Sequence, residues 1–170
     1  PALGLILERF PATFELATAA VLIAFTLGVG LGVVVSLKPY ALRSRVIMAG
    51  SLAGISIPTF LMGILLIMVF AVYLGWLPPF GRGETHQIGF WRTGLLSLDG
   101  LKHLILPALT LAMYQLAVLL RLTRAGMREV LAEEYIKTAW AKGLPPVKVI
   151  LKHALRNVMI PVVTVGGLQF

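Results

Sequence analysis

The sequence predicts an all-α membrane protein, a polytopic bundle of transmembrane helices. Hydrophobic residues make up 58% of the 170 residues and charged residues only 13%, whereas soluble domains average about 45–50% and about 25%. Four uncharged runs follow one another, at 16–37, 46–81, 104–120 and 157–170. A helix needs about 20 mostly apolar residues to cross the hydrocarbon core, so we expect about three complete spans and part of a fourth.

The two ends of the sequence indicate a fragment. The chain starts at Pro1 with no Met, no basic n-region and no cleavage site of the signal-peptide type, and the fourth uncharged run stops at Phe170. We therefore expect residues 1–170 to form a single, incomplete transmembrane domain. The absence of Cys excludes disulfides, thiolate metal sites and a Cys nucleophile.

The distribution of Lys and Arg predicts the orientation in the membrane. Eleven of the 15 lie in the linkers 38–45 and 121–156, and the other four precede the first span or lie in the second linker. Positive charges near span ends stay cytoplasmic, so we place both of these linkers in the cytoplasm. Such clusters also contact anionic lipid headgroups. Nucleic acid is not indicated by the net charge of +8, because the basic residues alternate with apolar helix positions and no nucleic-acid motif accompanies them.

The first span, 13–37, carries a face of small residues on which another helix can approach closely. These residues recur at spacings of three and four: Ala17, Ala20, Ala24, Gly28 and Gly32. The three glycines from Gly28 to Gly32 do not indicate a nucleotide loop, because they lie inside an apolar run with no polar helix start after them.

The second span, 46–76, belongs to a run too long for one straight crossing, since 36 residues of helix would reach about 54 Å across a core of about 30 Å. Pro58 lacks an N–H and clashes with the carbonyl four residues earlier, so we expect a kink or break there. Ser51, Ser56 and Thr59 are near enough to satisfy the freed backbone groups. The kink is either purely structural or borders a translocation path, in which case Ser56, Pro58 and Thr59 line that path.

The loop 77–103 reads as an irregular external segment, because it is rich in Gly and contains Pro78-Pro79. Its aromatic residues are expected to form a belt at the bilayer edge, and the loop could cap a pore. They are Trp76, Phe80, Phe90 and Trp91. His86 and His103 do not have a recognised ligand spacing, so we expect ordinary interfacial histidines and no metal site.

The third span, 104–124, places Gln115 near mid-depth of the membrane. An amide that faced lipid would go unsatisfied, so Gln115 should face protein or water. Both an interhelical hydrogen bond and contact with a transported substrate stay open, and Gln115 joins the candidate path residues.

The cytoplasmic loop, 125–156, is expected to begin as a helix that continues the third span, since Leu116 to Lys137 contains no Pro. Glu133 and Lys137 would form an i,i+4 pair on this helix. Gly143 is placed as its C-terminal cap. Pro146, preceded by another Pro, suits the first turn of a second helix.

The second cytoplasmic helix is predicted to be amphipathic. Its apolar stripe is Val147, Ile150, Leu151, Ala154, Leu155 and Val158, and its basic edge is Lys148, Lys152 and Arg156. The helix could lie flat on lipid or insert its apolar side into the groove of a partner, and the pattern alone favours neither.

The segment YIKTAWAKGLPPVKVILKHALRNVMIPV resembles the cytoplasmic signature loop of the integral-membrane subunits of binding-protein-dependent ABC importers. The segments LERFPATFELA, GISIPTFLMGILLI and GWLPPFGRGE resemble upstream parts of the same family. Lys137 stands where the general pattern has Glu, and Arg156 stands where it has Pro. These departures are typical of the branch that carries dipeptides, oligopeptides and nickel.

The resemblance implies the fold of a type I ABC importer permease with five or six spans in the whole subunit. It implies transport of peptides, with nickel or short oligosaccharides as alternatives within the branch. The implied partners are a homologous second permease subunit in a heterodimer, two ATPase subunits and an external solute-binding protein. The implied location is the inner membrane of a bacterial or archaeal cell, and no cofactor or catalytic residue is implied.

In that family the segment after the Gly forms a coupling helix that docks in a cleft of the ATPase subunit. Here that segment is Gly143 to Lys152, with Leu144, Val147 and Leu151 expected as apolar anchors. The full set of expected coupling residues is Ala139, Gly143, Leu144, Pro145, Val147, Lys148, Leu151 and Lys152.

Two other classes of protein fit the sequence less well. A secondary transporter would place ionisable residues within its spans, and the four uncharged runs contain none. A membrane-embedded enzyme would need a nucleophile with a base or a metal set such as HExxH, which the three His do not provide. No G-x-x-x-x-G-K-[ST] loop occurs, so the energy for an ATP-driven cycle must come from partner subunits.

Overall fold

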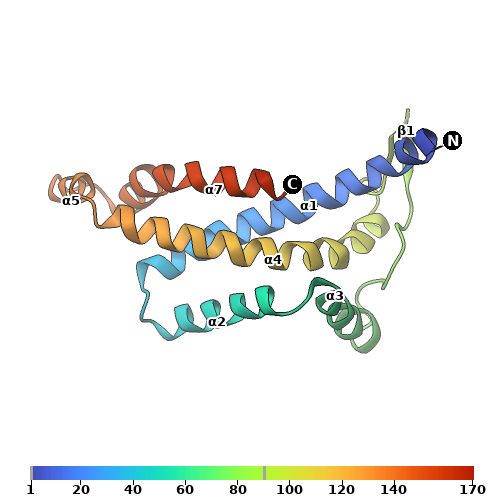
Figure 1. The fold of residues 1–170 in the computed structure, drawn as a ribbon, viewed down its shortest axis with the longest axis horizontal. Helices are drawn as coiled ribbons and strands as arrows, with labels where there is room; N and C mark the ends of the chain where they lie inside the picture. Colours follow the sequence, from blue (N-terminus) through green and yellow to red (C-terminus); the bar gives the residue numbers. More distant parts are fainter. Residues whose placement is uncertain (1, 90) are drawn as a thin grey trace. The chain divides into compact units, whose positions relative to one another are not determined.

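The computed structural model describes residues 2–89 and 91–170, and within them the chain is mainly helical (Figure 1). The elements are α1 (Ala2–Leu37), α2 (Leu42–Ser56), α3 (Thr59–Ile67), the π-helical η1 (Met68–Tyr73), β1 (His86–Ile88), β2 (Trp91–Thr93), α4 (Leu98–Leu131), α5 (Glu134–Ala141), α6 (Pro146–Lys148), the π-helical η2 (Val149–Leu155) and α7 (Arg156–Leu168). Among the described residues three helices are long and apolar enough to cross a membrane, or up to four if a bent pair counts as one span. The predicted all-α membrane fold is confirmed.

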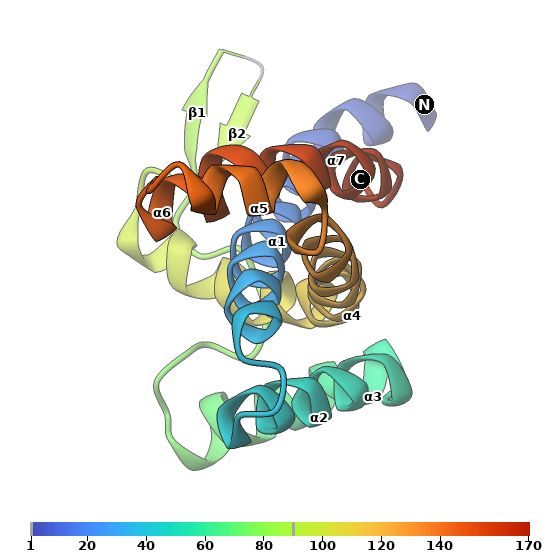
Figure 2. The same ribbon diagram turned by 90° about the vertical axis from the view of Figure 1, so that its left-hand side faces the viewer.

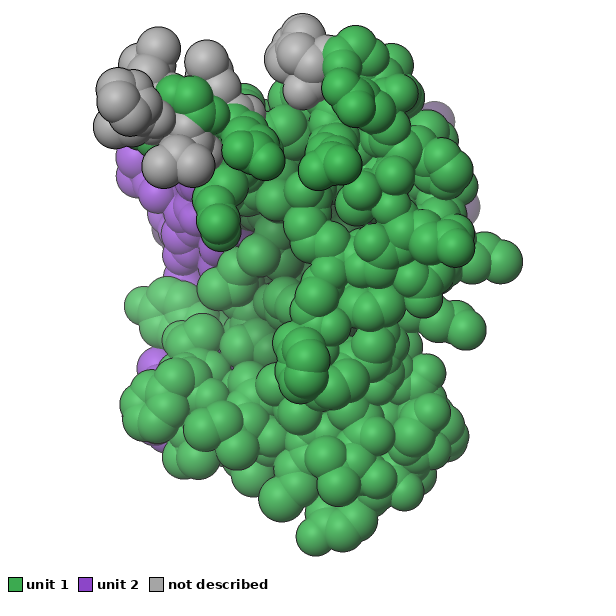
Figure 3. All heavy atoms as spheres, turned by 90° about the vertical axis from the view of Figure 1, so that its right-hand side faces the viewer, with its two compact units in different colours: residues 1–23, 57–114 green, residues 24–56, 115–170 purple. Residues whose placement is uncertain are grey.

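The chain divides into two compact units, which Figure 3 colours separately. Unit 1 consists of residues 1–23 and 57–114, and unit 2 of residues 24–56 and 115–170. Unit 1 contains the start of α1, α3, η1, the β1–β2 hairpin and the start of α4. Unit 2 contains the end of α1, α2, the end of α4 and all elements from α5 onwards.

The small residues of α1 pack against α4 in unit 2. A Cβ added to Gly28 would lie 2.9 Å from the Cβ of Leu119, and one added to Gly32 would lie 2.6 Å from the Cβ of Thr123. Gly30 has nothing within 4 Å of such a Cβ, so it faces away from this contact. The predicted close approach of a second helix is therefore confirmed, and the partner is α4.

The helix α7 lies beside the C-terminal part of α4 in both views (Figures 1 and 2). A Cβ added to Gly126 on α4 would lie 2.9 Å from Cγ1 of Val158 on α7. One added to Gly166 would lie 3.3 Å from the ring of Phe25 on α1. Three helices thus share the core of unit 2, and glycines at their contacts let the backbones approach.

The break at Pro58 is confirmed, because α2 ends at Ser56 and α3 begins at Thr59. Pro58 has φ −54° and ψ 139°, an extended conformation that precedes the first helical residue of α3. The expected repair of the break by hydroxyl groups is wrong for Ser51, whose Oγ donates to the Met48 carbonyl at 2.8 Å instead. A Ser between helical residues commonly makes this local bond to its own helix.

The helices are longer than the spans expected from hydropathy. α1 begins at Ala2 rather than 13, α4 covers Leu98–Leu131 rather than 104–124, and only residues 38–41 separate α1 from α2. Hydropathy counts residues that lie in lipid, whereas a helix can continue into the headgroup region and beyond it. The residues at which each span enters and leaves the membrane therefore stay predictions.

The loop 77–103, which was predicted to be external, contains more structure than expected. Within 77–103 the strands β1 and β2 pair antiparallel, with Gln87 opposite Arg92 and Ile88 opposite Trp91. Gly89 in the connecting turn has φ +62°, which a residue without Cβ adopts without strain. Phe90, one of the four aromatic residues expected at the bilayer edge, lies outside the described residues.

Candidate functional site

A tight turn at Gly143 separates α5 from the helix that starts at Pro146 in unit 2. Gly143 has φ +73° and its N–H donates to the Trp140 carbonyl at 2.9 Å, while the Leu144 N–H donates to the Ala139 carbonyl at 3.3 Å. This pair of bonds is a Schellman motif, which satisfies the last carbonyls of a helix. The predicted C-terminal cap at Gly143 is confirmed.

The helix before this turn is not the uninterrupted continuation of α4 that the sequence predicted. α4 ends at Leu131, and Glu133 has φ −66° and ψ 147°, so a new helix, α5, starts at Glu134. The expected pair between Glu133 and Lys137 is accordingly replaced by one between Glu134 Oε1 and Lys137 Nζ, at 2.7 Å. Because the backbone is extended at Glu133, the acidic partner of Lys137 is Glu134, one residue later.

The helix after the turn starts at Pro146, as predicted, and runs without interruption through α6, η2 and α7 to Leu168. The boundary expected at residue 156, between a cytoplasmic loop and a fourth span, is therefore not a break in the helix. The helical segment between Val149 and Leu155 has π geometry, with a wider turn than an α-helix.

The wide turn changes which residues of this helix are buried. Val149, Ala154 and Val158 are buried, whereas Val147 and Leu151 are 66% and 53% exposed. The predicted apolar stripe assumed α-helical spacing throughout, whereas in unit 2 it divides into buried Ala154 and exposed Val147 and Leu151. The role of Val147 and Leu151 as docking anchors stays a prediction. The step of five residues from Val149 to Ala154 matches a π turn.

Val147, Lys148, Leu151 and Lys152 together form an exposed surface, which we call the 147–152 face. Two of its side chains are apolar and two are cationic. Pro145 before it is also exposed and Leu144 is half-buried. The face has the composition of a small docking site, with apolar side chains for a groove and lysines for its rim.

The helix α5 supports this face from behind, since it lies against η2 (Figure 2). Ala139 and Ile136 on α5 are buried, so Ala139 has a packing role here and is not part of the exposed surface. Asn157 Nδ2 donates to the Tyr135 hydroxyl at 2.6 Å, which ties α5 to the start of α7. The packing of α5 against η2 therefore fixes the position of the helix that carries the 147–152 face.

The four candidate path residues do not gather in one place within either unit. Ser56 and Gln115 belong to unit 2, and Pro58 and Thr59 belong to unit 1. Gln115 Nε2 donates to the Gln169 carbonyl at 3.1 Å, so of the two alternatives the interhelical hydrogen bond is the one observed. Ser56, Pro58 and Thr59 are exposed. Their assignment to a path stays a prediction.

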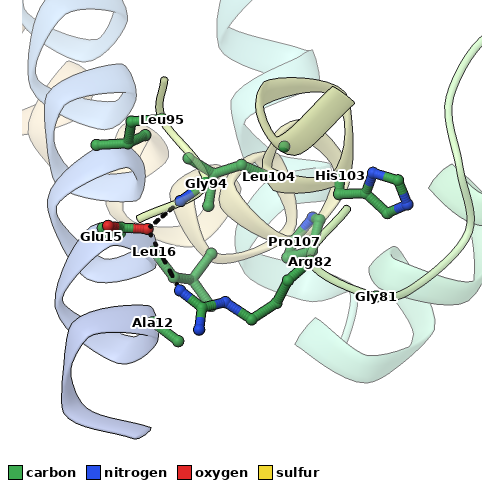
Figure 4. Close-up of a pocket in the computed structure, with 11 residues that line it drawn as sticks. Ala12, Glu15, Leu16, Gly81, Arg82, Gly94, Leu95, His103, Leu104 and Pro107 are labelled. Carbon is green, nitrogen blue, oxygen red and sulfur yellow. Dashed lines mark hydrogen bonds and ion pairs between the residues drawn. The ribbon is translucent and has the colours of Figure 1, made fainter. Parts of the chain in front are cut away.

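A buried glutamate in unit 1 was missed by the sequence analysis. Glu15 lies one residue before the first uncharged run, yet it is only 7% exposed. Its Oε1 accepts from Trp91 Nε1 at 3.0 Å, and its Oε2 accepts from the Gly94 N–H at 3.4 Å and lies 3.6 Å from Arg82 Nη2 (Figure 4). The carboxylate therefore holds the β1–β2 hairpin and the loop before it against α1.

Two cavities of unit 1 adjoin Arg82, the cationic partner of this carboxylate. Glu15, Arg82 and His103 are among the residues around one of about 130 Å³ (Figure 4). A second, of about 330 Å³, is lined mainly by charged side chains from α1, the loop and β2. No group of three His, Asp or Glu side chains in the described ranges converges as metal ligands would.

The long apolar helices are those of a membrane protein, and comparison with known families defines its class as a transport-system membrane component. Residues 9–170 match the family described as "Binding-protein-dependent transport system inner membrane component". The chain belongs to this family.

Similar proteins with curated names indicate the branch of the family to which the chain is most similar. The chain is 49% identical over 175 residues to the di/tripeptide transport system permease protein DppB of Pseudomonas aeruginosa (strain UCBPP-PA14), covering 96% of this chain and 52% of that protein. It is 40% identical over 176 residues to the dipeptide permease DppB of Escherichia coli (strain K12), covering 95% and 52%. It is 41% identical over 165 residues to the glutathione transport system permease protein GsiC of the same strain, covering 97% and 49%. The chain spans about half the length of these relatives.

Proposed function

We propose that this chain is part of the membrane subunit of an ATP-driven importer that carries peptides delivered by an external binding protein. The printed functions of the relatives, transport of dipeptides, tripeptides and glutathione, all concern short peptides. They favour peptides over nickel or oligosaccharides as the substrate. The spans contribute to the translocation path together with a homologous second permease subunit.

The 147–152 face is the observation that carries the coupling part of this proposal. Two large apolar side chains, Val147 and Leu151, are left exposed on a helix that its own unit packs from the other side. Full burial of such side chains contributes about 1.5–3 kcal/mol each, so a partner groove is their most favourable environment. ATP hydrolysis belongs to the separate ATPase subunits that supply this groove, and linkers 38–45 and 121–156 are cytoplasmic in this arrangement.

Force passes from the ATPase to the membrane through an uninterrupted helix. α6, η2 and α7 form one helical segment from Pro146 to Leu168, with α7 packed on α4 through Gly126 and Val158. ATPase closure moves the 147–152 face, and the continuous backbone hydrogen bonding transmits this displacement to the spans. The spans then alternate between outward-facing and inward-facing states.

The test uses the complete importer with the full-length permease in nanodiscs. Val147→Asp combined with Leu151→Asp places two charges in the apolar groove, where each loses its hydration. We expect a loss of at least about 3 kcal/mol in docking, or about 100-fold in affinity of the ATPase for the membrane subunits. The measurements are co-purification of the ATPase and peptide-stimulated ATP hydrolysis.

Tyr40→Asp is the matched control, because Tyr40 is 81% exposed on the predicted cytoplasmic side and lies outside the 147–152 face. It should leave docking and ATP hydrolysis unchanged. In proteoliposomes, peptide uptake that persists in the double variant, or that runs on an ion gradient without the ATPase, would contradict the proposal and favour a secondary transporter.

A further inference from the structure

Three arginines line one cavity in unit 1. The cavity of about 330 Å³ is bounded by Glu8, Arg9, Ala12, Thr13, Arg82 and Arg92, and we call it the arginine pocket. Its residues come from α1, from the loop after η1 and from β2, so three separate segments converge on it. Its volume lies in the range of small-molecule sites, which begins at about 300 Å³.

The charges of the arginine pocket are unbalanced. Arg82 faces Glu15 at 3.6 Å. The guanidinium groups of Arg9 and Arg92 make no hydrogen bond or ion pair within residues 2–89 and 91–170, and Glu8 is the one acidic residue among the lining side chains. Neighbouring cations repel one another unless an anion offsets them. A guanidinium binds carboxylates in a planar, two-bond geometry, so the pocket is suited to a carboxylate.

One of the three arginines, Arg82, is held in place before any ligand arrives. Arg82 Nη2 donates to the Arg92 carbonyl at 3.1 Å, which fixes the loop to β2. Glu15 orients Arg82, and it also binds the hairpin through the Trp91 indole and the Gly94 N–H. A site whose cations are positioned in advance binds an anion with a smaller entropy cost.

We propose that the arginine pocket binds the terminal carboxylate of a free peptide, with Glu8 receiving the peptide's ammonium group. This inference rests on the proposed function and assigns to the external side of unit 1 a receiving site for the substrate. The mixed sign of the lining matches a zwitterion, because Glu8 would repel a ligand that carried only negative charge. Arg9 and Arg92 are exposed, so the site binds weakly and releases its ligand readily, as a transport route requires.

The experiment uses the full-length permease assembled with its partner permease and ATPases in nanodiscs, without the binding protein. A dipeptide with a photoreactive side chain is compared with the same dipeptide as its C-terminal amide. Labelled residues are located by mass spectrometry. We expect labelling in 8–13 and 82–92, with about tenfold more labelling by the free acid, since one charge-assisted carboxylate bond corresponds to about that factor.

Three variants and one control separate the pocket from general charge effects. Arg9→Gln and Arg92→Gln should each lower labelling by the free acid about tenfold and leave labelling by the amide unchanged. Arg92→Lys should restore part of the loss, since it keeps the charge and loses the planar geometry. Lys102→Gln, which removes an exposed cation of the same unit outside the pocket, should have no effect.

Four outcomes would overturn the proposal. The first two are equal labelling by acid and amide, and labelling unaffected by the arginine variants. The third is displacement of the label by phosphatidylglycerol or phosphatidylethanolamine in the nanodisc. The fourth, measured in a parallel sample to which the binding protein is added, is arginine variants that lose only its stimulation of ATP hydrolysis. The third would assign the pocket to a lipid headgroup, and the fourth to an acidic surface of the binding protein. Carboxylate-dependent labelling in a complex that transports no peptide would support the pocket and contradict the proposed function. Normal peptide uptake without such labelling would support the proposed function and contradict the pocket.

Discussion

The glycines at the contact of α1 and α4 allow a prediction with an internal control. Gly28 and Gly32 face α4, and Gly30, between them on the same helix, faces away. Ala in place of each glycine adds one methyl group to the same helix in the same environment of the sequence. Any difference between the three variants therefore reports the contact rather than the chemistry of the substitution.

The magnitudes follow from what each new methyl group meets. At Gly32 the Cβ would lie 2.6 Å from Thr123 Cβ and 2.9 Å from the Leu120 carbonyl oxygen, so backbone must move. At Gly28 the nearest atoms are Leu119 Cβ at 2.9 Å and the Leu116 carbonyl oxygen at 3.0 Å. Overpacking of this kind costs about 1–3 kcal/mol, with Gly32→Ala towards the upper end.

Gly30→Ala has no such cost and gains the helix preference of Ala over Gly, about 0.5–1 kcal/mol. The free energy of unfolding should therefore differ by about 2–3 kcal/mol between Gly30→Ala and Gly32→Ala, with Gly28→Ala in between. The assay is SDS-induced unfolding of the full-length permease in mixed micelles. If Gly30→Ala lowered the free energy of unfolding as much as Gly32→Ala, the close contact with α4 would not be its cause.

Three further predictions concern the turn at Gly143, the buried carboxylate of Glu15 and the contact between α5 and α7. Gly143→Ala places a Cβ at φ +73° and should lower the free energy of unfolding by about 1–2 kcal/mol, measured in the same micelles. Glu15→Ala leaves the Trp91 indole and the Gly94 N–H without their acceptor and should cost about 2–4 kcal/mol, with a change in tryptophan emission. Tyr135→Phe removes the hydroxyl bound by the Asn157 amide and should cost about 0.5–1.5 kcal/mol, measured as a lower melting temperature.

Each of these variants has a control. Gly167→Ala adds a methyl group within α7 where nothing lies within 4 Å and φ is not positive, so it should not lower the free energy of unfolding. Glu8→Ala removes an exposed carboxylate of α1 and should leave tryptophan emission unchanged. Tyr114→Phe removes the hydroxyl of a half-exposed tyrosine on α4. A variant that behaved like its control would contradict the contact assigned to it.

Local backbone chemistry could be predicted from the sequence because it depends on single residues. Pro58 has no N–H to continue a helix, Pro146 suits a first helical turn, and Gly143 can adopt a positive φ. Each of these properties holds in any environment. The breaks, starts and caps of the helices were accordingly placed correctly at these three positions.

The features that depend on tertiary packing could not be predicted. The acceptor Glu15 and the donors Trp91 and Gly94 are 76 and 79 residues apart in sequence, so no local pattern connects them. The π geometry of η1 and η2 likewise has no residue signature, because Val149 to Leu155 would fit an α-helix equally well by propensity. The division of the apolar stripe into buried Ala154 and Val158 and exposed Val147 and Leu151 therefore could not be predicted.

The wide turns of η2 also set the angular phase between the two ends of the helix that runs from Pro146 to Leu168. Each residue of an α-helix advances the side chains by about 100°, so one residue more or fewer in η2 would turn everything before it by that amount relative to α7. Val147 and Leu151 would then point in another direction with their own chemistry unchanged. The number of residues between Pro146 and Arg156 is thus as much a determinant of partner recognition as their identity, and deletions there should be tolerated less well than substitutions.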